Sequence, residues 1–143
     1  FETFFNAKAF NNDVSKWDMS RVTNIWNMFY GASVFNRNLA KWDVSTSTDL
    51  SHMFQNAKLF NCDLSKWDTS RVTTMQQTFM GAEGFNGDVS TWNTSRVTTM
   101  KETFFNAKAF NNDVSKWDTK KVVKMYQTFY QAEAFNSDIS KWV

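Results

Sequence analysis

The repeat unit that decides the fold of this chain reads FNCDLSKWDTSRVTTMQQTFMGAEG at residues 60–84. The same pattern recurs every 25 residues along the 143-residue sequence, and four of its columns are unbroken. The columns are Trp at 17, 42, 67, 92, 117 and 142; Phe-Asn at 10–11, 35–36, 60–61, 85–86, 110–111 and 135–136; a second Phe at 4, 29, 54, 79, 104 and 129; and Ala at 7, 32, 57, 82, 107 and 132. A fixed period of this length is typical of proteins whose successive repeats stack on one another.

The repeats predict a single domain over residues 1–143. It would comprise a partial repeat at 1–9, full coils at 10–34, 35–59, 60–84, 85–109 and 110–134, and a partial repeat at 135–143. Residues 2–18 are identical to residues 102–118, which indicates that a block of four repeats was duplicated. We therefore expect the array to continue in a longer parent protein.

Each coil is expected to contain a short helix. Between residues 25 and 35 the recurring apolar positions are 25, 29, 32 and 35, and steps of four, three and three place them on one helical face. The β-branched Val14 and its equivalents lie between short polar residues, which predicts a short strand. The Asp and Ser residues after each Trp predict a turn. The expected fold class is an α/β repeat solenoid of six coils, each with a strand, a turn and a short helix, stacked about 4.8 Å apart.

Two columns are expected to form ladders along the stack. A buried Asn in every coil could bond the backbone of its own and the neighbouring coils; these residues are Asn11, Asn36, Asn61, Asn86, Asn111 and Asn136. The Trp column, formed by Trp17, Trp42, Trp67, Trp92, Trp117 and Trp142, could be buried in the core. It could also line an outer face of the stack, and the sequence leaves both options open.

An aromatic stripe is the candidate interface. The residue after each buried Phe of the second Phe column should lie at the edge of the core or outside it. The interface residues are Phe5, Tyr30, Met80, Phe105 and Tyr130, together with Trp26 and Tyr126, which lie four residues before a stripe position. An exposed patch of this kind usually marks a contact surface. Lateral packing between neighbouring coils is the alternative.

The charge distribution and the composition limit which ligands the chain is expected to bind and which reactions it is expected to catalyse. The 16 basic and 14 acidic residues are well mixed, so no basic stripe predicts binding to nucleic acid, and no apolar run predicts membrane insertion. With one histidine, His52, and one cysteine, Cys62, neither a zinc site nor a Ser–His nucleophile is expected. We expect no catalytic residue and no cofactor.

Two columns of acidic residues leave open the alternative that the chain binds metal ions. They are Asp13, Asn38, Asp63, Asp88, Asp113 and Asp138, and Asp18, Asp43, Asp68, Asn93 and Asp118. Stacked carboxylates repel one another, so something must offset their charge. We expect each side chain to accept backbone N–H bonds in a turn and to face a nearby Lys. A row of calcium ions held by these oxygens is the alternative.

The repeat resembles a known family. Its pattern N-x-D-[VIL]-S-x-W-[DN]-x-S-x-V-x-x-M-x-x-x-F-x-x-A-x-x-F is similar to the BspA-like leucine-rich-repeat proteins, and more narrowly to a bacterial surface-protein repeat also found in mycoplasma lipoproteins. Asn38 and Ser47 depart from it, as do Thr78, Thr103 and Thr128, where the family prefers a second Met. The resemblance implies a curved, leucine-rich-repeat-like solenoid on extracellular or cell-surface proteins, some of which bind host proteins. It brings no catalytic residues.

The function expected from these observations is a non-catalytic protein-interaction or adhesion module that binds another protein. Two alternatives remain. The chain could be an architectural subunit packed into a large assembly, or it could bind carbohydrate through an exposed Trp ladder. Because neither end of the array carries a polar cap, self-association through the end coils is also expected.

Overall fold

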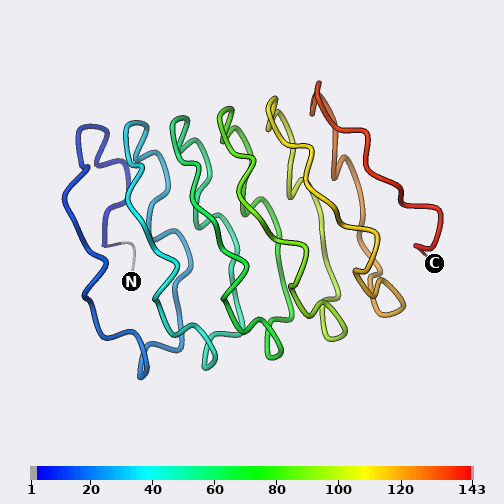
Figure 1. Cartoon of the computed structure of the whole chain (residues 1–143), viewed down its shortest axis with the longest axis horizontal. Helices are drawn as coiled ribbons and strands as arrows, with labels where there is room; N and C mark the ends of the chain where they lie inside the picture. The colour runs from blue at the N-terminus through cyan, green and yellow to red at the C-terminus, as the bar shows by residue number, and fades with distance from the viewer. Residues whose placement is uncertain (1–2, 143) are drawn as a thin grey trace.

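The computed structural model describes residues 3–142, in which the chain winds into a row of stacked coils. The N-terminal coil lies at one end of the row and the C-terminal coil at the other (Figure 1). Residues 25 positions apart lie side by side, as the parallel bridges Asp49–Thr74 and Thr74–Thr99 show. The outermost bounds of the two predicted partial repeats, residues 1–2 and 143, lie outside the described residues.

The coils contain almost no regular secondary structure. Residues 3–142 form no helix, and only Asp49, Thr74, Thr99 and Lys124 take part in isolated parallel bridges. The prediction of an α/β solenoid of the leucine-rich-repeat type, with a strand and a short helix in each coil, is therefore wrong. Turns and irregular backbone make up nearly the whole of every coil.

The predicted helix is a succession of tight turns. In the segment 25–35, Met28 N donates to Ile25 O at 3.3 Å and Ala32 N to Phe29 O at 3.1 Å, which are turn bonds across three residues. The intervening amides donate to the next coil instead, as Phe29 N does to Met53 O at 2.9 Å. An α-helix would send each N–H back to the carbonyl four residues earlier. Here every second amide is used to join neighbouring coils.

Left-handed backbone residues at two columns close these turns. Asn27 and Gly31 have φ of 56° and 68°, and each is the third residue of its turn, where a type II turn needs a positive φ. One column comprises Asn27, His52, Gln77, Glu102 and Gln127; the other comprises Asn6, Gly31, Asn56, Gly81, Asn106 and Gln131. A right-handed helix cannot pass through such residues, although the turns keep the apolar side chains facing inward.

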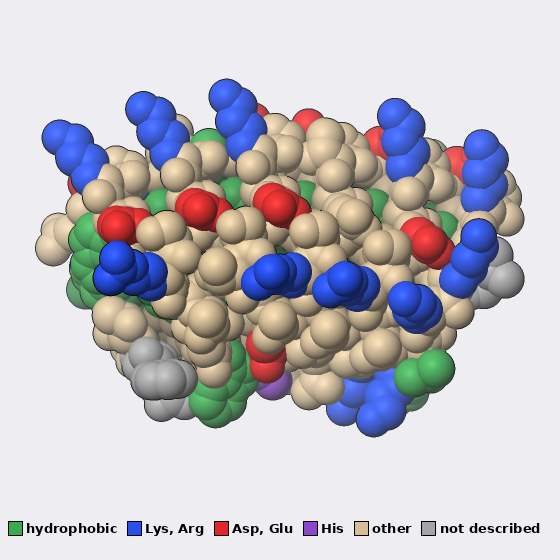
Figure 2. Space-filling model, turned by 90° about the horizontal axis from the view of Figure 1, so that it is seen from below, with side chains coloured by type: hydrophobic (Ala, Val, Ile, Leu, Met, Phe, Trp, Pro, Cys, Tyr) green, Lys and Arg blue, Asp and Glu red, His purple; other side chains and the backbone are tan. Residues whose placement is uncertain are grey.

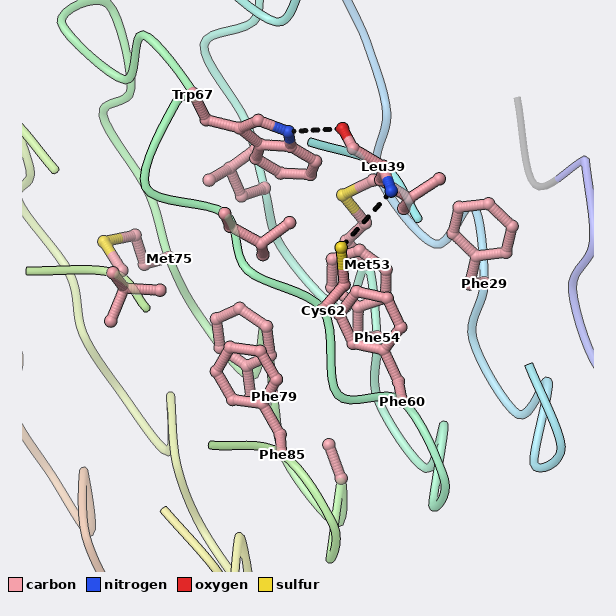
Figure 3. Packing of buried hydrophobic residues seen from close by; sticks show 14 of the residues in the cluster. Phe29, Leu39, Met53, Phe54, Phe60, Cys62, Trp67, Met75, Phe79 and Phe85 are labelled. Atoms are coloured by element: carbon pink, nitrogen blue, oxygen red, sulfur yellow. Dashed lines mark hydrogen bonds between the residues drawn. The ribbon is translucent and has the colours of Figure 1, made fainter. Parts of the chain in front are cut away.

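Aromatic rings fill the core. In each interior coil the two Phe columns form a stacked pair, with the rings of Phe79 and Phe85 centred 3.9 Å apart. Phe79 also stacks on Phe54 at 5.6 Å and on Phe104 at 5.4 Å in the adjacent coils. These Phe side chains are fully buried, and the same packing continues through Met53, Met75 and Leu39 (Figure 3). Because each ring touches rings in both neighbouring coils, no coil has a separate core.

Buried hydroxyl groups complete the interior in the C-terminal half. Thr78 Oγ1 lies 2.9 Å from Met75 O in its own coil and 3.0 Å from Leu50 O in the preceding coil. Thr103 and Thr128 make the equivalent contacts. Thr can therefore replace Met in this column because a carbonyl in each of two coils is placed to accept its proton.

Candidate functional site

The candidate interface consists of two separate aromatic pairs at the surface. Phe5 stacks on Tyr30 with ring centroids 4.7 Å apart, and Phe105 stacks on Tyr130 at 5.0 Å. Phe5 and Tyr130 are 43% and 49% exposed, although the preceding residue in each coil points into the core. The structure thus brings together the stripe residues of adjacent coils in pairs.

Polar contacts interrupt the stripe between these pairs. Gln55 is buried, and its Nε2 donates to Met80 Sδ at 3.5 Å, while its Oε1 lies 2.7 Å from His52 Nδ1. Trp26 and Tyr126 are exposed. The helical spacing that grouped them with the stripe does not exist, and no ring contact within residues 3–142 joins Trp26 to Tyr30 or Tyr126 to Tyr130. They flank the stripe instead of extending it.

A hollow of about 510 Å³ lies beside the first aromatic pair. It is lined by Phe5, Asn6, Lys8, Tyr30, Gly31, Ser33, Asn56 and Lys58. The sequence analysis missed every member of this set except Phe5 and Tyr30. One signal could have found three of them: Asn and Gly alternate at 6, 31 and 56, directly before the Ala column, and both residues favour left-handed backbone. The hollow offers aromatic rings, amides and two ammonium groups to a ligand.

A line of charges runs from this hollow along the stack. Lys58 Nζ lies 3.2 Å from Glu83 Oε1, and Lys108 Nζ lies 3.7 Å from Glu83 Oε2. The hydrogen bond from Lys58, reinforced by the charges of both lysines, holds the pKa of Glu83 below its usual range. Since all three side chains are largely exposed, these pairs contribute little to stability. They leave Lys8 as a lysine at the rim of the hollow without such a partner within residues 3–142.

The Asn column lies at the surface. Each Asn Oδ1 accepts the backbone N–H of the Asn in the next coil at 2.8–3.0 Å, in a series that runs from Asn11 to Asn136. The expectation that these side chains are buried is wrong, because all but the half-buried Asn11 are exposed. The amide bonds therefore connect the coils along an outer edge of the stack.

The Trp column is buried along most of its length. Trp42, Trp67, Trp92 and Trp117 are each 3% exposed, and the rings of Trp67 and Trp92 stack at 6.1 Å. Each indole Nε1 donates to a carbonyl of the preceding coil, as Trp67 does to Leu39 O at 3.0 Å (Figure 3). The alternative of an exposed Trp ladder that binds carbohydrate is therefore wrong: the ring faces already contact one another.

The two acidic columns form turns at the surface. Asp43 Oδ1 accepts bonds from Ser45 N at 3.0 Å and from Ser45 Oγ at 2.6 Å, and Asp68 binds Ser70 N in the same way. The Ser hydroxyl and amide lower the pKa of both carboxyl groups. Rows of basic side chains run along this face with acidic side chains between them, which offsets the repulsion between stacked carboxylates (Figure 2). The described part of the chain contains no group of three or more residues placed to hold a metal ion, so the calcium alternative finds no donor cluster there.

These features define a class: a tandem-repeat stack of coils that carries aromatic pairs and a polar hollow at its surface. Residues 1–83 and 61–143 each match one family, described as Mycoplasma protein of unknown function, DUF285. The chain therefore belongs to this repeat-containing family. No curated protein and no solved structure matches it. None of the described residues forms a helix long and apolar enough to cross a bilayer.

Proposed function

We propose that the chain is a non-catalytic protein-interaction or adhesion module. Its contact surface would comprise the Phe5–Tyr30 and Phe105–Tyr130 pairs, with the hollow beside the first pair as the main recognition site. The observation that carries the proposal is the presence of two stacked aromatic pairs at the surface, in which Phe5 and Tyr130 are exposed and their partners half-buried. The middle members of the same column, Gln55 and Met80, hydrogen-bond to each other instead. Aromatic side chains of this kind supply much of the binding energy at protein interfaces.

The chemistry of the hollow favours a protein partner with a carboxylate next to an apolar side chain. Phe5 and Tyr30 supply ring surface, and Lys8 supplies positive charge at the rim, where Lys58 is paired with Glu83. The side chain of Asn56 can accept or donate hydrogen bonds beside them. We further propose, from the resemblance to bacterial surface repeats, that the protein is secreted or displayed on a cell surface.

Photo-crosslinking tests the proposed surface. A photoreactive phenylalanine analogue at Tyr130 or Tyr30 should capture the partner. The same analogue at the exposed Val123, which neither belongs to the stripe nor lines the hollow, should not. The captured protein is then purified and its affinity measured by calorimetry. The Phe105→Ala/Tyr130→Ala and Phe5→Ala/Tyr30→Ala variants should each bind at least about tenfold more weakly, equivalent to roughly 1.4 kcal/mol.

Urea unfolding of the same variants separates binding from packing. If the pairs serve recognition, their truncation should change the unfolding midpoint little, because both pairs lie outside the core. Unchanged affinity in both double variants would refute the proposal. A large loss of stability with a matching loss of binding would instead assign the pairs to lateral packing between coils.

A further inference from the structure

We infer that two copies of this chain pair side by side through the charged face that carries the acidic columns. The two copies would lie parallel, related by a two-fold axis that runs along the stack, so that opposite charges meet coil by coil. This face shares no residue with the aromatic pairs or with the hollow, so the inference does not depend on the function proposed above.

The charged face consists of four columns of side chains. The first and third are the acidic columns that begin at Asp13 and Asp18, and the second and fourth are basic columns that begin at Lys16 and Arg21. Acidic and basic rows therefore alternate across the face (Figure 2). Each column repeats every 25 residues, so the same four positions occur in five coils, at residues 13–21, 38–46, 63–71, 88–96 and 113–121.

The charges of this face are not paired within one chain. All side chains of the four columns are exposed in these coils, apart from the half-buried Thr46 and Asp88. Within residues 3–142, every ion pair is formed by one of three lysines that lie outside the face, which are Lys58, Lys101 and Lys108. The carboxylates bind the serines of their own turns, and the basic side chains remain available to a partner.

Two coils show which columns are matched to each other. In the coil 38–46 the first column holds Asn38 and the fourth holds Thr46, so both charges are missing together. In the coil 88–96 the second column holds Thr91 and the third holds Asn93, and again both charges are missing together. The first column is thus matched to the fourth, and the second column to the third.

Neighbours within one chain do not explain this matching. Hydrogen bonds from the turn serines lower the pKa of Asp13 and Asp68, and the nearby charges of Lys16 and Arg71 lower it further. Inside a chain the first column therefore lies near the second, and the third lies near the fourth. In the two exceptional coils, one member of each such neighbouring pair is charged and the other is neutral. The matching must therefore serve a contact with another molecule.

A second copy placed face to face satisfies the matching. A two-fold axis parallel to the stack, between the second and third columns, reverses the order of the columns in the facing copy. The first column of each copy then faces the fourth column of the other, and the second faces the third, within the same coil. Such an interface is isologous and closes as a dimer. A two-fold axis across the columns would instead place every column against itself, where like charges repel.

Repetition along the stack gives this association its strength and its register. In the coils 13–21, 63–71 and 113–121 all four positions are charged. An exposed ion pair contributes little by itself, and salt screens it. A dimer held by many such pairs is weak, and its affinity falls steeply as the ionic strength rises. The uncharged positions of the other two coils fix the register, because a shift by one coil would place them against unpaired charges.

Sedimentation velocity across a concentration series at two ionic strengths tests the pairing. At about 0.01 M salt, where the Debye length is about 30 Å, the average mass should rise toward twice the 16.7 kDa of one copy. At about 1 M salt, where the Debye length is about 3 Å, the protein should remain a single copy. A single copy at every concentration in low salt would overturn the inference, and so would association that salt does not weaken.

Charge-neutralising variants test whether the face itself makes the contact. A second-column variant and a matched control each remove three positive charges; they are Lys41→Gln/Lys66→Gln/Lys116→Gln on the face and Lys8→Gln/Lys58→Gln/Lys108→Gln outside it. The second-column variant should raise the Kd of the dimer at least about tenfold, whereas the control should leave it nearly unchanged. An equal effect of both variants would show that net charge alone controls association, which would overturn the inference.

Neutralising the facing column tests the matching between columns. The changes Asp43→Asn, Asp68→Asn and Asp118→Asn, added to the second-column variant, leave neutral pairs like that of Thr91 and Asn93. The turns should persist, since Asn93 Oδ1 accepts Ser95 N at 3.1 Å. The combined variant should therefore dimerise no more weakly than the second-column variant. A further loss of about tenfold would mean that the two columns act independently, against the inference. Circular dichroism melts confirm that each variant is folded.

Cross-linking measures the orientation of the two copies. Thr91 is exposed and lies in the second column, beside the proposed axis, so Thr91→Cys in a Cys62→Ser background leaves every charge of the face in place. A short bismaleimide should link copies of this variant to each other, because each coil meets its own equivalent. In an antiparallel dimer the coil 88–96 would face the coil 38–46. Preferential linking of Thr91→Cys to Ala40→Cys in a mixture would therefore overturn the parallel arrangement.

Discussion

Replacement of Gly81 by Ala should change the free energy of unfolding in opposite directions in a turn and in a helix, so it distinguishes the two structures. In a helix interior this change stabilises a protein by roughly 0.5–1 kcal/mol, because Gly loses more conformational freedom on folding. Gly81 instead has φ of 67°. In that left-handed region a residue with a Cβ costs roughly 1–2 kcal/mol. The structure therefore predicts that Gly81→Ala destabilises the protein.

The neighbouring coil adds to this cost. A Cβ at Gly81 would fall against Asn56 Oδ1, and one at Gly31 against Asn6 Oδ1. These oxygens are at the ends of side chains that can rotate away, so the contact adds only modestly to the loss of stability. We expect Gly81→Ala to lower the free energy of unfolding by more than the backbone cost of roughly 1–2 kcal/mol. In an Asn56→Gly background the side-chain contact is absent, and the loss should shrink toward the backbone cost alone.

Urea titration followed by tryptophan fluorescence measures both values, since the buried indoles become exposed on unfolding. Gly31→Ala provides an independent repeat of the experiment two repeats earlier, where φ is 68°. A Gly81→Ala protein as stable as the wild type, or more stable, would refute the left-handed turn. An equal loss with Asn and with Gly at position 56 would show that the coils do not touch there.

The buried threonines and the acidic turns give two further predictions. Thr78→Val should lower the free energy of unfolding by about 1 kcal/mol in the same titration, because two buried carbonyls lose their hydroxyl donor, whereas the exposed Thr23→Val should change little. The lowered pKa of Asp43 and Asp68 stabilises the folded state above the ordinary value of 3.8, and this contribution is lost as the pH falls through the lower folded-state pKa. Asp68→Asn should therefore weaken the dependence of the melting temperature on pH below about 4. The turn itself should persist, since Asn93 forms the same turn without a charge. A melting temperature that depends on pH in this range as strongly as in the wild type would contradict this.

The period of the repeat predicted which residues lie beside one another. Every column spaced by 25 residues, such as Phe54, Phe79 and Phe104, is a file of contacting side chains in the structure. The local backbone could not be predicted in the same way. Apolar steps of four, three and three fit a helix, but a series of turns places Ile25, Phe29, Ala32 and Phe35 inside the core equally well.

One of the two left-handed columns has a signal in the sequence and the other does not. Asn and Gly at positions 6, 31, 56, 81 and 106 are poor in helix interiors and common in left-handed backbone. His52, Gln77 and Glu102 have no such preference, yet their φ values are 59°, 55° and 54°. Bonds between coils impose this backbone, as when Gln77 N donates to Lys101 O. Only the stacked neighbour explains it, and a single repeat cannot show it.

The surface was predictable in composition but not in arrangement. The stripe position holds aromatic rings at the surface in the first and last coils, of which Phe5 and Tyr130 are exposed. Their grouping into two pairs depends on Gln55, which turns inward to meet Met80. The hollow beside Phe5 and Tyr30 is lined by both Asn6 and Gly31, and Asn6 Oδ1 lies where a Cβ at Gly31 would fall. Both features arise from contacts between coils that carry different residues, which the consensus of the repeat averages away.

The bonds that join the coils also set how the protein would respond to tension between its termini. Bonds such as Phe79 N to Thr103 O span adjacent coils along the row, so a pull along the row loads them one layer at a time instead of all together. The coils would therefore detach one after another. Each detached coil frees 25 residues, which extend to about 85 Å of chain. Stretched in this way, the protein would lengthen in discrete steps at low force, as a tether that extends one coil at a time.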